Sequence, residues 1–288
     1  MKKPEPIGTR KSLWGEGPAW HNGRLLYVDI HAHLILEFDP ESGEENQWQL
    51  DQQVGFVAPC ESGQLLFGGD NGLFYLDRKS GECSEICDPE PDLPHNRFND
   101  GKCSPDGRLF AGTIAQDKVT GAAKLYRLDP DLSLSVAYAP VTNSNGLAWS
   151  ADKGTLYYID TPTKQVKAFD YDASTGEIHN ERVVIDTSPL DGSPDGMTID
   201  AEDHLWIAFC HGGRVSRFDP ATGKEVETLS IPAHETTACT FGGPDCRDLY
   251  ITTGTAKDQE EEFGGSLFVV RGLPVGGRPA SVFKNTGS

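Results

Sequence analysis

Four short segments of the sequence repeat a pair made of an acidic or amide residue and a glycine. The pairs are Glu16-Gly17, Asp100-Gly101, Asn145-Gly146 and Asp195-Gly196. Each pair precedes a short apolar stretch that ends in a turn, so the four polar residues share one position of a repeated unit. Carboxylate and amide oxygens are the ligands that hard divalent cations such as Ca²⁺, Mg²⁺ and Mn²⁺ prefer. The chemistry that these residues could perform together is therefore the binding of a divalent cation.

The elements that must position these residues are predicted from six runs rich in β-branched and aromatic residues. The runs begin 39 to 49 residues apart and cover residues 25–30, 64–69, 108–113, 155–160, 204–209 and 248–253. A period of about 40–50 residues with four short strands per repeat is typical of a propeller blade. The sequence therefore predicts an all-β fold, a six-bladed β-propeller built as one domain over residues 1–288.

Turns with a common composition separate strands inside these repeats. A strand that ends in an apolar residue and Asp runs into a turn, in most cases closed by glycine, at residues 38–43, 75–81, 127–131, 169–176 and 218–223. Proline presets φ in such turns and glycine takes the left-handed position. No segment of about 10–15 residues has helical periodicity, which argues against a parallel sheet with crossover helices. We expect residues 7–13 to close the ring by adding a strand to the last blade, near residues 266–284.

The innermost strands of a propeller face the central axis. If the four polar residues open these strands, their side chains converge in the central channel and form one metal site. Asn-Gly and Asp-Gly pairs are also common in turns, and a single pair would be interpreted as a turn between blades. Four pairs at equivalent positions favour the metal site.

Composition and charge exclude several classes of protein. The chain has 25 Lys and Arg against 44 Asp and Glu, a net charge of -19, and lacks the basic patches that nucleic-acid binding requires. No apolar run approaches the roughly 18 residues of a membrane span, and the basic first residues have no apolar core of a signal peptide behind them. The seven cysteines follow no disulfide-scaffold spacing, which predicts reduced thiols in a cytoplasmic protein.

Histidines offer a weaker set of candidate ligands. His31 and His33 lie two residues apart, on one face of an expected strand, but no third ligand accompanies them. Catalytic zinc takes three protein ligands, so a structural or surface role is favoured for this pair. His211 and His234 could line the rim of the channel, and the sequence alone does not decide their role. The absence of a G-x-S-x-G motif disfavours a serine esterase.

The sequence resembles the sugar-lactonase family that includes gluconolactonase and regucalcin (senescence marker protein 30). The resemblance covers nearly the whole chain. It rests on ordered motifs such as L-W-G-E-G-P-A-W (13–20), R-F-N-D-G-K-C-S-P-D-G-R-L-F-A-G-T (97–113), S-N-G-L-A-W-S (144–150), P-D-G-M-T-I-D (194–200) and C-T-F-G-G (239–243).

The resemblance implies a role for individual residues. Glu16, Asn145 and Asp195 match the metal ligands of the family, and Asp195 also matches its proposed acid/base group. Arg97 and Asn99 match residues that hold the hydroxyls of the sugar lactone. Asp117 aligns with a glutamate that contacts substrate in regucalcin, and its shorter side chain implies a different substrate preference.

Asp100 shares the position of the ligands but has no role assigned by the resemblance. We expect it to support the metal ligands without binding the ion itself.

These observations predict a metal-dependent hydrolase that converts a sugar lactone, such as gluconolactone, to the aldonic acid. One divalent cation, Ca²⁺, Mg²⁺, Mn²⁺ or Zn²⁺, would polarise the ester carbonyl. The alternatives are a promiscuous phosphotriesterase-like hydrolase on the same fold and a non-catalytic calcium-binding or interaction propeller. The Arg97 and Asn99 pair favours the lactonase, because a structural metal site has no use for a group that holds hydroxyls. The expected partner is a small sugar lactone, with no nucleic acid or membrane, and the expected state is a monomer or weak homodimer.

Overall fold

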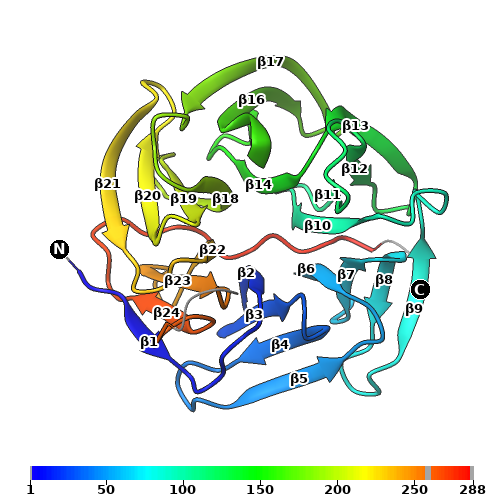
Figure 1. Cartoon of the computed structure of the whole chain (residues 1–288). Coiled ribbons are helices and arrows are strands. Elements are labelled where there is room, and N and C mark those ends of the chain that lie inside the picture. Colours follow the sequence, from blue (N-terminus) through cyan, green and yellow to red (C-terminus); the bar gives the residue numbers. More distant parts are fainter. Residues whose placement is uncertain (1, 257–260, 286–288) are drawn as a thin grey trace.

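Six four-stranded antiparallel sheets stand around a central axis in the computed structural model, which describes residues 2–256 and 261–285 (Figure 1). Each sheet is one blade, and the predicted six-bladed β-propeller is confirmed. The six apolar runs of the sequence form the second strand of each blade. No helix among the described residues is long and apolar enough to cross a membrane.

The first three blades follow one another along the chain, and their strands are given from the channel outward. Blade 1 consists of β2 (Gly15–His21), β3 (Arg24–Asp29), β4 (Leu34–Phe38) and β5 (Glu45–Gln49). Blade 2 consists of β6 (Val54–Pro59), β7 (Leu65–Gly69), β8 (Gly72–Leu76) and β9 (Cys83–Cys87). Blade 3 consists of β10 (Asn96–Cys103), β11 (Leu109–Ala115), β12 (Ala123–Leu128) and β13 (Leu134–Val141).

The last three blades complete the ring. Blade 4 consists of β14 (Ser144–Trp149), β15 (Thr155–Asp160), β16 (Gln165–Asp172) and β17 (Glu177–Asp186), with a 3₁₀ turn, η1 (Thr161–Thr163), after β15. Blade 5 consists of β18 (Ser193–Ile199), β19 (Leu205–Cys210), β20 (Arg214–Asp219) and β21 (Lys224–Ser230). Blade 6 consists of β22 (Thr236–Gly242), β23 (Asp248–Thr253), β24 (Leu267–Val270) and β1 (Glu5–Ile7).

An N-terminal strand closes the ring, but its predicted bounds were wrong. The closing strand is β1, which pairs with β24 from Glu5 opposite Val269 to Ile7 opposite Leu267. Gly8 follows with φ +66° and takes the backbone out of the extended conformation. Residues 8–13 therefore lead into blade 1 instead of forming the closing strand.

The chain after β24 forms a strap, residues 271–285, which crosses the disc as the red segment of Figure 1. The backbone N–H of Ala280 donates to the carbonyl of Trp20 at 3.1 Å, and that of Phe283 donates to the carbonyl of Pro59 at 2.8 Å. The Phe283 side chain is fully buried between blades 2 and 3. The strap thereby ties together blades that are distant from it in sequence.

Apolar side chains fill the space between neighbouring blades. Six clusters of buried apolar residues in the described part of the chain each join one pair of adjacent blades, and together they run around the whole ring. The seven cysteines all lie in the described part of the chain and are free thiols, four of them buried. The blades therefore depend on apolar packing, with the strap and β1 as closures.

All six innermost strands carry a break in their pairing with the second strand of the blade. The breaks lie between Glu16 and Ala19, Val54 and Phe56, Phe98 and Asp100, Asn145 and Leu147, Pro194 and Met197, and Thr236 and Ala238. Three of the four polar-glycine pairs thus lie at β-bulges inside the inner strands, and in blade 3 the break lies directly before Asp100. The pairs are therefore not turns between blades, which was the less favoured interpretation. A bulge bends its strand and changes the direction in which a side chain points.

Glycines at these breaks are required where neighbouring inner strands approach one another. A Cβ on Gly55 would lie 2.3 Å from the carbonyl oxygen of Phe98, and one on Gly146 would lie 2.8 Å from that of Asp195. Such distances leave no room for any side chain. The repeated pair therefore places a polar group at the bulge and lets the next blade pack against its glycine.

The outer hairpins use the turns that the sequence predicts. Gly43, Gly81, Gly176 and Gly223 have φ between +72° and +76°, and the N–H of each donates to the carbonyl of an Asp at the end of the preceding strand or directly after it. This is the left-handed position that glycine tolerates without a steric cost.

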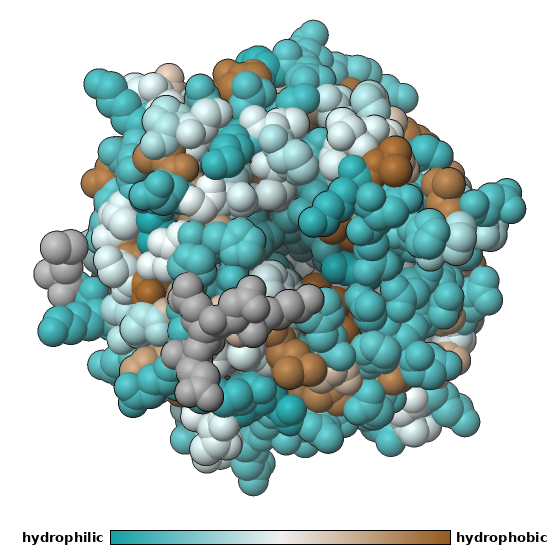
Figure 2. All heavy atoms as spheres, viewed as in Figure 1, coloured by the Kyte–Doolittle hydropathy of each residue, from teal (hydrophilic) through white to brown (hydrophobic). Residues whose placement is uncertain are grey.

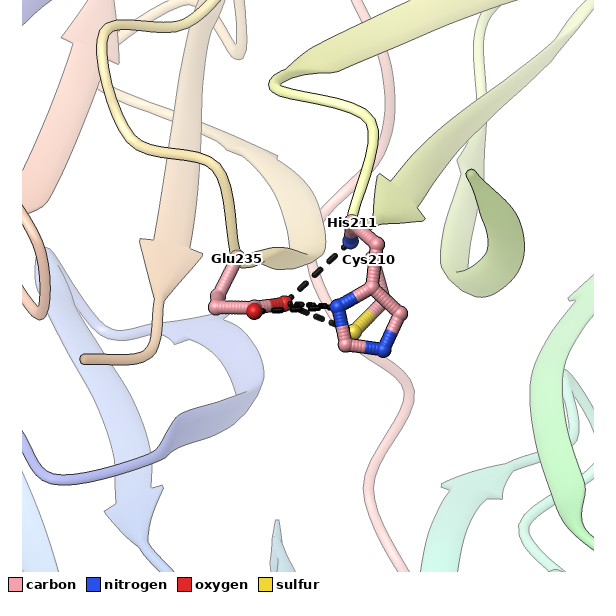
Figure 3. Close-up of side chains that lie close together, drawn as sticks. All are labelled: Cys210, His211 and Glu235. Carbon is pink, nitrogen blue, oxygen red and sulfur yellow. Dashed lines mark hydrogen bonds and ion pairs between the residues drawn. The ribbon is translucent and has the colours of Figure 1, made fainter. Parts of the chain in front are cut away.

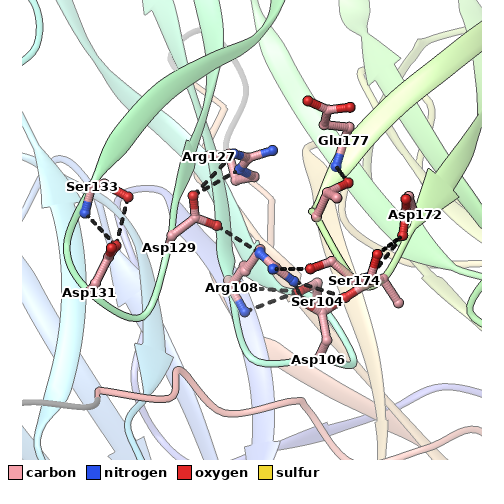
Figure 4. A network of polar contacts seen from close by, with 12 residues as sticks. Ser104, Asp106, Arg108, Arg127, Asp129, Asp131, Ser133, Asp172, Ser174 and Glu177 are labelled. Carbon is pink, nitrogen blue, oxygen red and sulfur yellow. Dashed lines mark hydrogen bonds and ion pairs between the residues drawn. The ribbon is translucent and has the colours of Figure 1, made fainter.

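One arginine connects these turns across two blades (Figure 4). Arg108 forms an ion pair with Asp106 and another with Asp129, at 2.7 Å, within blade 3. Its remaining N–H groups donate to the carbonyls of Ala173 and Ser174 in blade 4, both at 3.0 Å. The guanidinium therefore links the outer turn of one blade to that of the next.

The close approach of the inner strands can be tested at Gly55, where blade 2 has no polar residue in the channel. We expect Gly55→Ala to lower the free energy of unfolding by about 1–3 kcal/mol, because the new methyl group collides with backbone atoms of Phe98 and Asn99. Urea unfolding measures this. Gly154→Ala, whose Cβ meets only the Asp152 side chain at 3.3 Å, is the control and should cost less. Equal stability of Gly55→Ala and the parent chain would contradict the packing argument.

Candidate active site

The axis of the propeller opens at a hollow near the centre of the disc, with hydrophilic side chains on much of its rim (Figure 2). Glu16, Asp100, Asn145 and Asp195 each precede a glycine in four inner strands, at or beside the break in strand pairing, and only 3–8% of each is exposed. Blades 2 and 6 have Val54 and Thr237 at this position.

The three carboxyl groups of this set act on one another electrostatically. Burial, followed by the negative charge of Asp100, raises the pKa of Glu16 from 4.5 to about 8. Burial and the charges of Glu16, Asp100 and Glu235 raise the pKa of Asp195 well above its usual value. Burial also raises the pKa of Asp100. These groups therefore carry more negative charge than their surroundings offset, which is the condition in which a bound cation stabilises a site.

Two buried cationic groups lie close to the carboxylates. The Lys102 ammonium donates to the carbonyl of Met197 at 2.7 Å, and burial lowers its pKa. Burial also lowers the pKa of Arg97 to about 10. Both positive charges act on Glu16, but they leave its pKa raised.

A neighbouring hydroxyl fixes the orientation of the Asn145 amide. The Asn145 Nδ2 donates to Thr161 Oγ1 at 2.8 Å, and Thr161 Oγ1 donates to the carbonyl of Pro194 at 2.9 Å. The amide oxygen of Asn145 is thereby turned away from Thr161, and it accepts from Asn99 Nδ2 at 3.2 Å. Sequence reasoning missed Thr161, whose only signal is its place directly after the strand that ends at Asp160.

Arg97 and Asn99 are hydrogen-bonded to each other, and Asn99 also connects blade 3 to blade 4. Arg97 Nη1 donates to Asn99 Oδ1 at 2.8 Å and to the carbonyl of Phe98 at 2.9 Å. Asn99 Nδ2 donates to Asn143 Oδ1 at 3.1 Å and to the carbonyl of Ser144 at 2.8 Å. The Asn99 amide is therefore a structural bridge in addition to any contact with a ligand.

Asp117 lies apart from the buried cluster. It is exposed in the turn after β11, and its Oδ1 accepts from the N–H of Val119 at 3.2 Å. The structure thus places it in a surface turn.

The expectation that His31 and His33 share one face of a strand is wrong. Strand β3 ends at Asp29, and both histidines lie in the turn that follows, where His33 has φ +58°. The Asp29 carboxylate accepts from the N–H groups of Leu13 and Trp14, so its side chain anchors the end of the strand there.

His211 and His234 lie next to each other, with ring centroids 5.9 Å apart. His211 belongs to a cluster with Cys210 and Glu235 (Figure 3). Cys210 pairs with Ser193, at the start of the strand that carries Asp195, so the cluster lies on the channel side of blade 5. Sequence reasoning singled out the two histidines but missed Cys210 and Glu235 as their partners, because Glu235 comes from the next blade.

The channel continues beyond Asp100 into a cavity of about 190 Å³. Lys102, Trp149 and Met197 line it, and strap residues 278–281 form part of its wall. The carboxylate cluster therefore has an open hollow on one side and this cavity on the other.

The fold and the site together define the class of this protein. It is a six-bladed β-propeller with buried carboxylates on its inner strands. The family described as "SMP-30/Gluconolactonase/LRE-like region" matches residues 14–255. The chain belongs to this family, which confirms the resemblance that its motifs indicate.

The sequences of individual relatives align with this chain over almost their whole length. Regucalcin of Xenopus laevis is 37% identical over 281 residues, which cover 93% of this chain and 94% of the relative. A protein of Bacillus subtilis (strain 168), YvrE, whose name provisionally assigns it to the sugar lactone lactonases, is 38% identical over 274 residues with the same coverage. A solved structure of regucalcin from Agrobacterium tumefaciens, described as a calcium-binding protein, superposes with a TM-score of 0.92 at 28% identity and covers 98% of this chain and 97% of that one.

The raised pKa of Glu16 predicts a stability that depends on pH in metal-free protein. Between pH 4.5 and about 8 the folded chain holds a proton that the unfolded chain has released, so stability should fall as pH rises through this window. The free energy of unfolding should fall by on the order of 1 kcal/mol per pH unit. Urea unfolding of chelated protein at both ends of the window measures it.

The control for this pH dependence exchanges the titrating group. Glu16→Gln should reduce the slope, and the remainder comes from Asp195 and Asp100, whose pKa values are also raised. Glu61→Gln, at an exposed position, should leave the slope unchanged. A slope that survives unchanged in Glu16→Gln would show that Glu16 is not the group responsible.

Proposed function

We propose that the protein hydrolyses a sugar lactone, such as gluconolactone, to the aldonic acid and requires one divalent cation. The observation that carries the proposal is the meeting of three buried carboxyl groups, Glu16, Asp100 and Asp195, with the Asn145 amide in the channel. Membership of a family named after gluconolactonase supports the reaction class.

The residues present fit a cation held by Glu16, Asn145 and Asp195. Two carboxylates and one amide balance a doubly charged ion, and their oxygens suit Ca²⁺, Mg²⁺ and Mn²⁺, while Zn²⁺ also accepts carboxylates. The raised pKa of Glu16 supports this assignment, because a cation would relieve the repulsion that raises it. Asp100 adds negative charge beside this set and is proposed to support it without being a ligand.

When bound, the cation would supply Lewis-acid polarisation of the ester carbonyl. Asp195 is the proposed base that accepts the proton of the attacking water and later returns it to the leaving oxygen. Such positioned proton transfer contributes roughly 10²–10⁴-fold. Thr161 keeps the Asn145 amide in one orientation throughout, because its hydroxyl engages the amide nitrogen.

Arg97 and Asn99 are proposed to bind the substrate hydroxyls. The Nε of Arg97 is buried without a hydrogen-bond partner among the described residues, so it has a donor to offer to a ligand. Asp117, at the surface turn after β11, is proposed as a further substrate contact, one methylene shorter than the glutamate of the regucalcin branch.

A second candidate is a calcium-binding propeller without catalytic activity. It is favoured by the description of the Agrobacterium tumefaciens regucalcin structure as a calcium-binding protein. A phosphotriesterase-like activity would use the same carboxylate set. Turnover on a panel of lactones and phosphotriesters separates the three functions.

Removal of metal should abolish lactone hydrolysis. We expect chelated protein, checked by elemental analysis, to lose turnover and to regain it with single divalent ions, more than one of them effective, because the ligands are all oxygen atoms. Full turnover by metal-free protein would contradict the cation dependence. Calcium binding without turnover on any lactone would instead favour the non-catalytic propeller.

Asp195→Asn should lower kcat at saturating metal by at least ~10²-fold, because an amide keeps an oxygen ligand but cannot accept the proton. Cation affinity should fall only modestly. Asp186→Asn, at the exposed end of β17, is the matched control and should retain the parent rate. If Asp195→Asn turns over near the parent rate, Asp195 is a ligand only, and Asp100 is the next base to test.

A further inference from the structure

The cluster of Cys210, His211 and Glu235 joins two blades beside the channel (Figure 3). Cys210 is the last residue of β19 and His211 follows it in the turn, whereas Glu235 directly precedes β22 of the next blade. Cys210 and Glu235 are buried, and the His211 side chain is 59% exposed. The cluster therefore has a buried side, formed by Cys210 and Glu235, and a side at His211 that is exposed to solvent.

The position of Cys210 places the cluster next to the carboxylates of the channel. Tyr158 pairs with Leu147 in blade 4, and Ile207 pairs with Met197 at the equivalent place in blade 5. Thr161 and Cys210 each lie three residues after these strand residues, so Cys210 corresponds to Thr161. Thr161 holds a polar residue of its own inner strand. The charge of Asp195 acts on Cys210, and that of Glu235 acts on Asp195.

One atom of each residue lies within 4.8 Å of the others. His211 Nδ1 lies 2.7 Å and 2.9 Å from the two carboxylate oxygens of Glu235, and Cys210 Sγ lies 3.2 Å from one of them. The backbone N–H of His211 also donates to Glu235 at 3.2 Å. The three functional groups thus converge on one point, with the carboxylate between the thiol and the imidazole.

We propose that Cys210, His211 and Glu235 form a second metal site, separate from the set of Glu16, Asn145 and Asp195, that binds Zn²⁺ or a chemically similar ion such as Co²⁺. A thiolate, an imidazole and a carboxylate are the ligand types that zinc takes in proteins. Three protein ligands leave the fourth tetrahedral position to water. The exposed side of His211 provides the path by which the ion enters.

The geometry needs only a small expansion to hold the ion. Zinc–ligand distances of roughly 2.0–2.3 Å in a tetrahedron place neighbouring ligand atoms about 3.3–3.6 Å apart. The observed nitrogen–oxygen and sulfur–oxygen distances of 2.7–3.2 Å are slightly shorter, because protons now join these atoms. Replacement of the protons by one ion moves the ligand atoms apart by a few tenths of an ångström.

The charges and protons balance in this exchange. The Cys210 thiol releases its proton to solvent when sulfur binds the ion. The His211 proton moves from Nδ1 to Nε2, which leaves Nδ1 free to coordinate. One thiolate and one carboxylate then neutralise one doubly charged cation.

The opposing interpretation is that Glu235 only ties blade 5 to blade 6 through hydrogen bonds. Such a tie does not require a thiol, since the two N–H groups of His211 already engage the carboxylate. His211 also has φ +60°, a conformation that glycine adopts at lower cost. The buried thiol beside the imidazole and the carboxylate favours the metal site.

Cobalt provides the test, because Co²⁺ bound to a thiolate gains a charge-transfer absorption that oxygen-bound Co²⁺ lacks. Metal-stripped full-length protein is titrated with Co²⁺ under reducing conditions, and then with Zn²⁺. We expect the absorption of one thiolate-bound Co²⁺ per chain, to which Co²⁺ at the oxygen ligands of the first site adds nothing, and its disappearance when Zn²⁺ displaces the ion. It should be lost in Cys210→Ser and strongly weakened in His211→Ala and Glu235→Gln.

Two controls make the result specific. Cys83→Ser, which removes an exposed thiol elsewhere in the molecule, should keep the absorption. The double variant Glu16→Gln, Asp195→Asn, in which the first site is disabled, should keep it as well, so the result does not depend on the proposed lactonase. Circular dichroism confirms that each variant is folded.

Either of two outcomes would overturn the proposal. One is a parent protein that binds Co²⁺ without thiolate absorption. The other is an absorption that persists in folded Cys210→Ser. Loss of the absorption in the double variant would also count against it, because the two sites would then not be separate.

Discussion

The burial of several carboxyl groups at one axis is the constraint on which the rest of this structure depends. Burial raises the pKa of Glu16, Asp100 and Asp195. The charge of Asp100 raises that of Glu16 further, and the charges of Glu16 and Asp100 raise that of Asp195. Such a cluster is costly in an empty channel and useful when a cation shares it. The fold must therefore hold these side chains rigidly enough that the repulsion does not push them apart.

The scaffold meets this demand by packing the inner strands directly against each other. In blades 1, 4 and 5 a bulge of the inner strand turns a polar side chain out of the ladder, and the glycine after that residue lets the next inner strand approach closely. Asn99 and Thr161 then connect neighbouring inner strands with hydrogen bonds. The strap and β1 close the ring, so no blade can move away from the axis without breaking contacts on both sides.

Much of this could be predicted from the sequence because propeller blades repeat. The period of the apolar runs predicts six blades, and the shared register predicts that Glu16, Asp100, Asn145 and Asp195 occupy equivalent positions. The errors fall where local patterns are ambiguous. A single polar-glycine pair is typical of a turn, and only the pairing of the strands shows that these pairs lie at or beside bulges. The closing strand was placed too late in the chain because Gly8 ends it, and His33 lies in a turn that begins at Asp29.

The sequence by itself determined the fold class, the family and the residues that face the axis, because each of these follows from order and spacing along one chain. The tertiary structure alone decided which residues from different blades meet. Cys210 and His211 end one blade and Glu235 begins the contact surface of the next, 24 residues after His211, with no motif to link them. The same holds for the amide of Asn145, which Thr161 orients. Such contacts arise from the angle between neighbouring blades, and the periodicity of the sequence does not predict that angle.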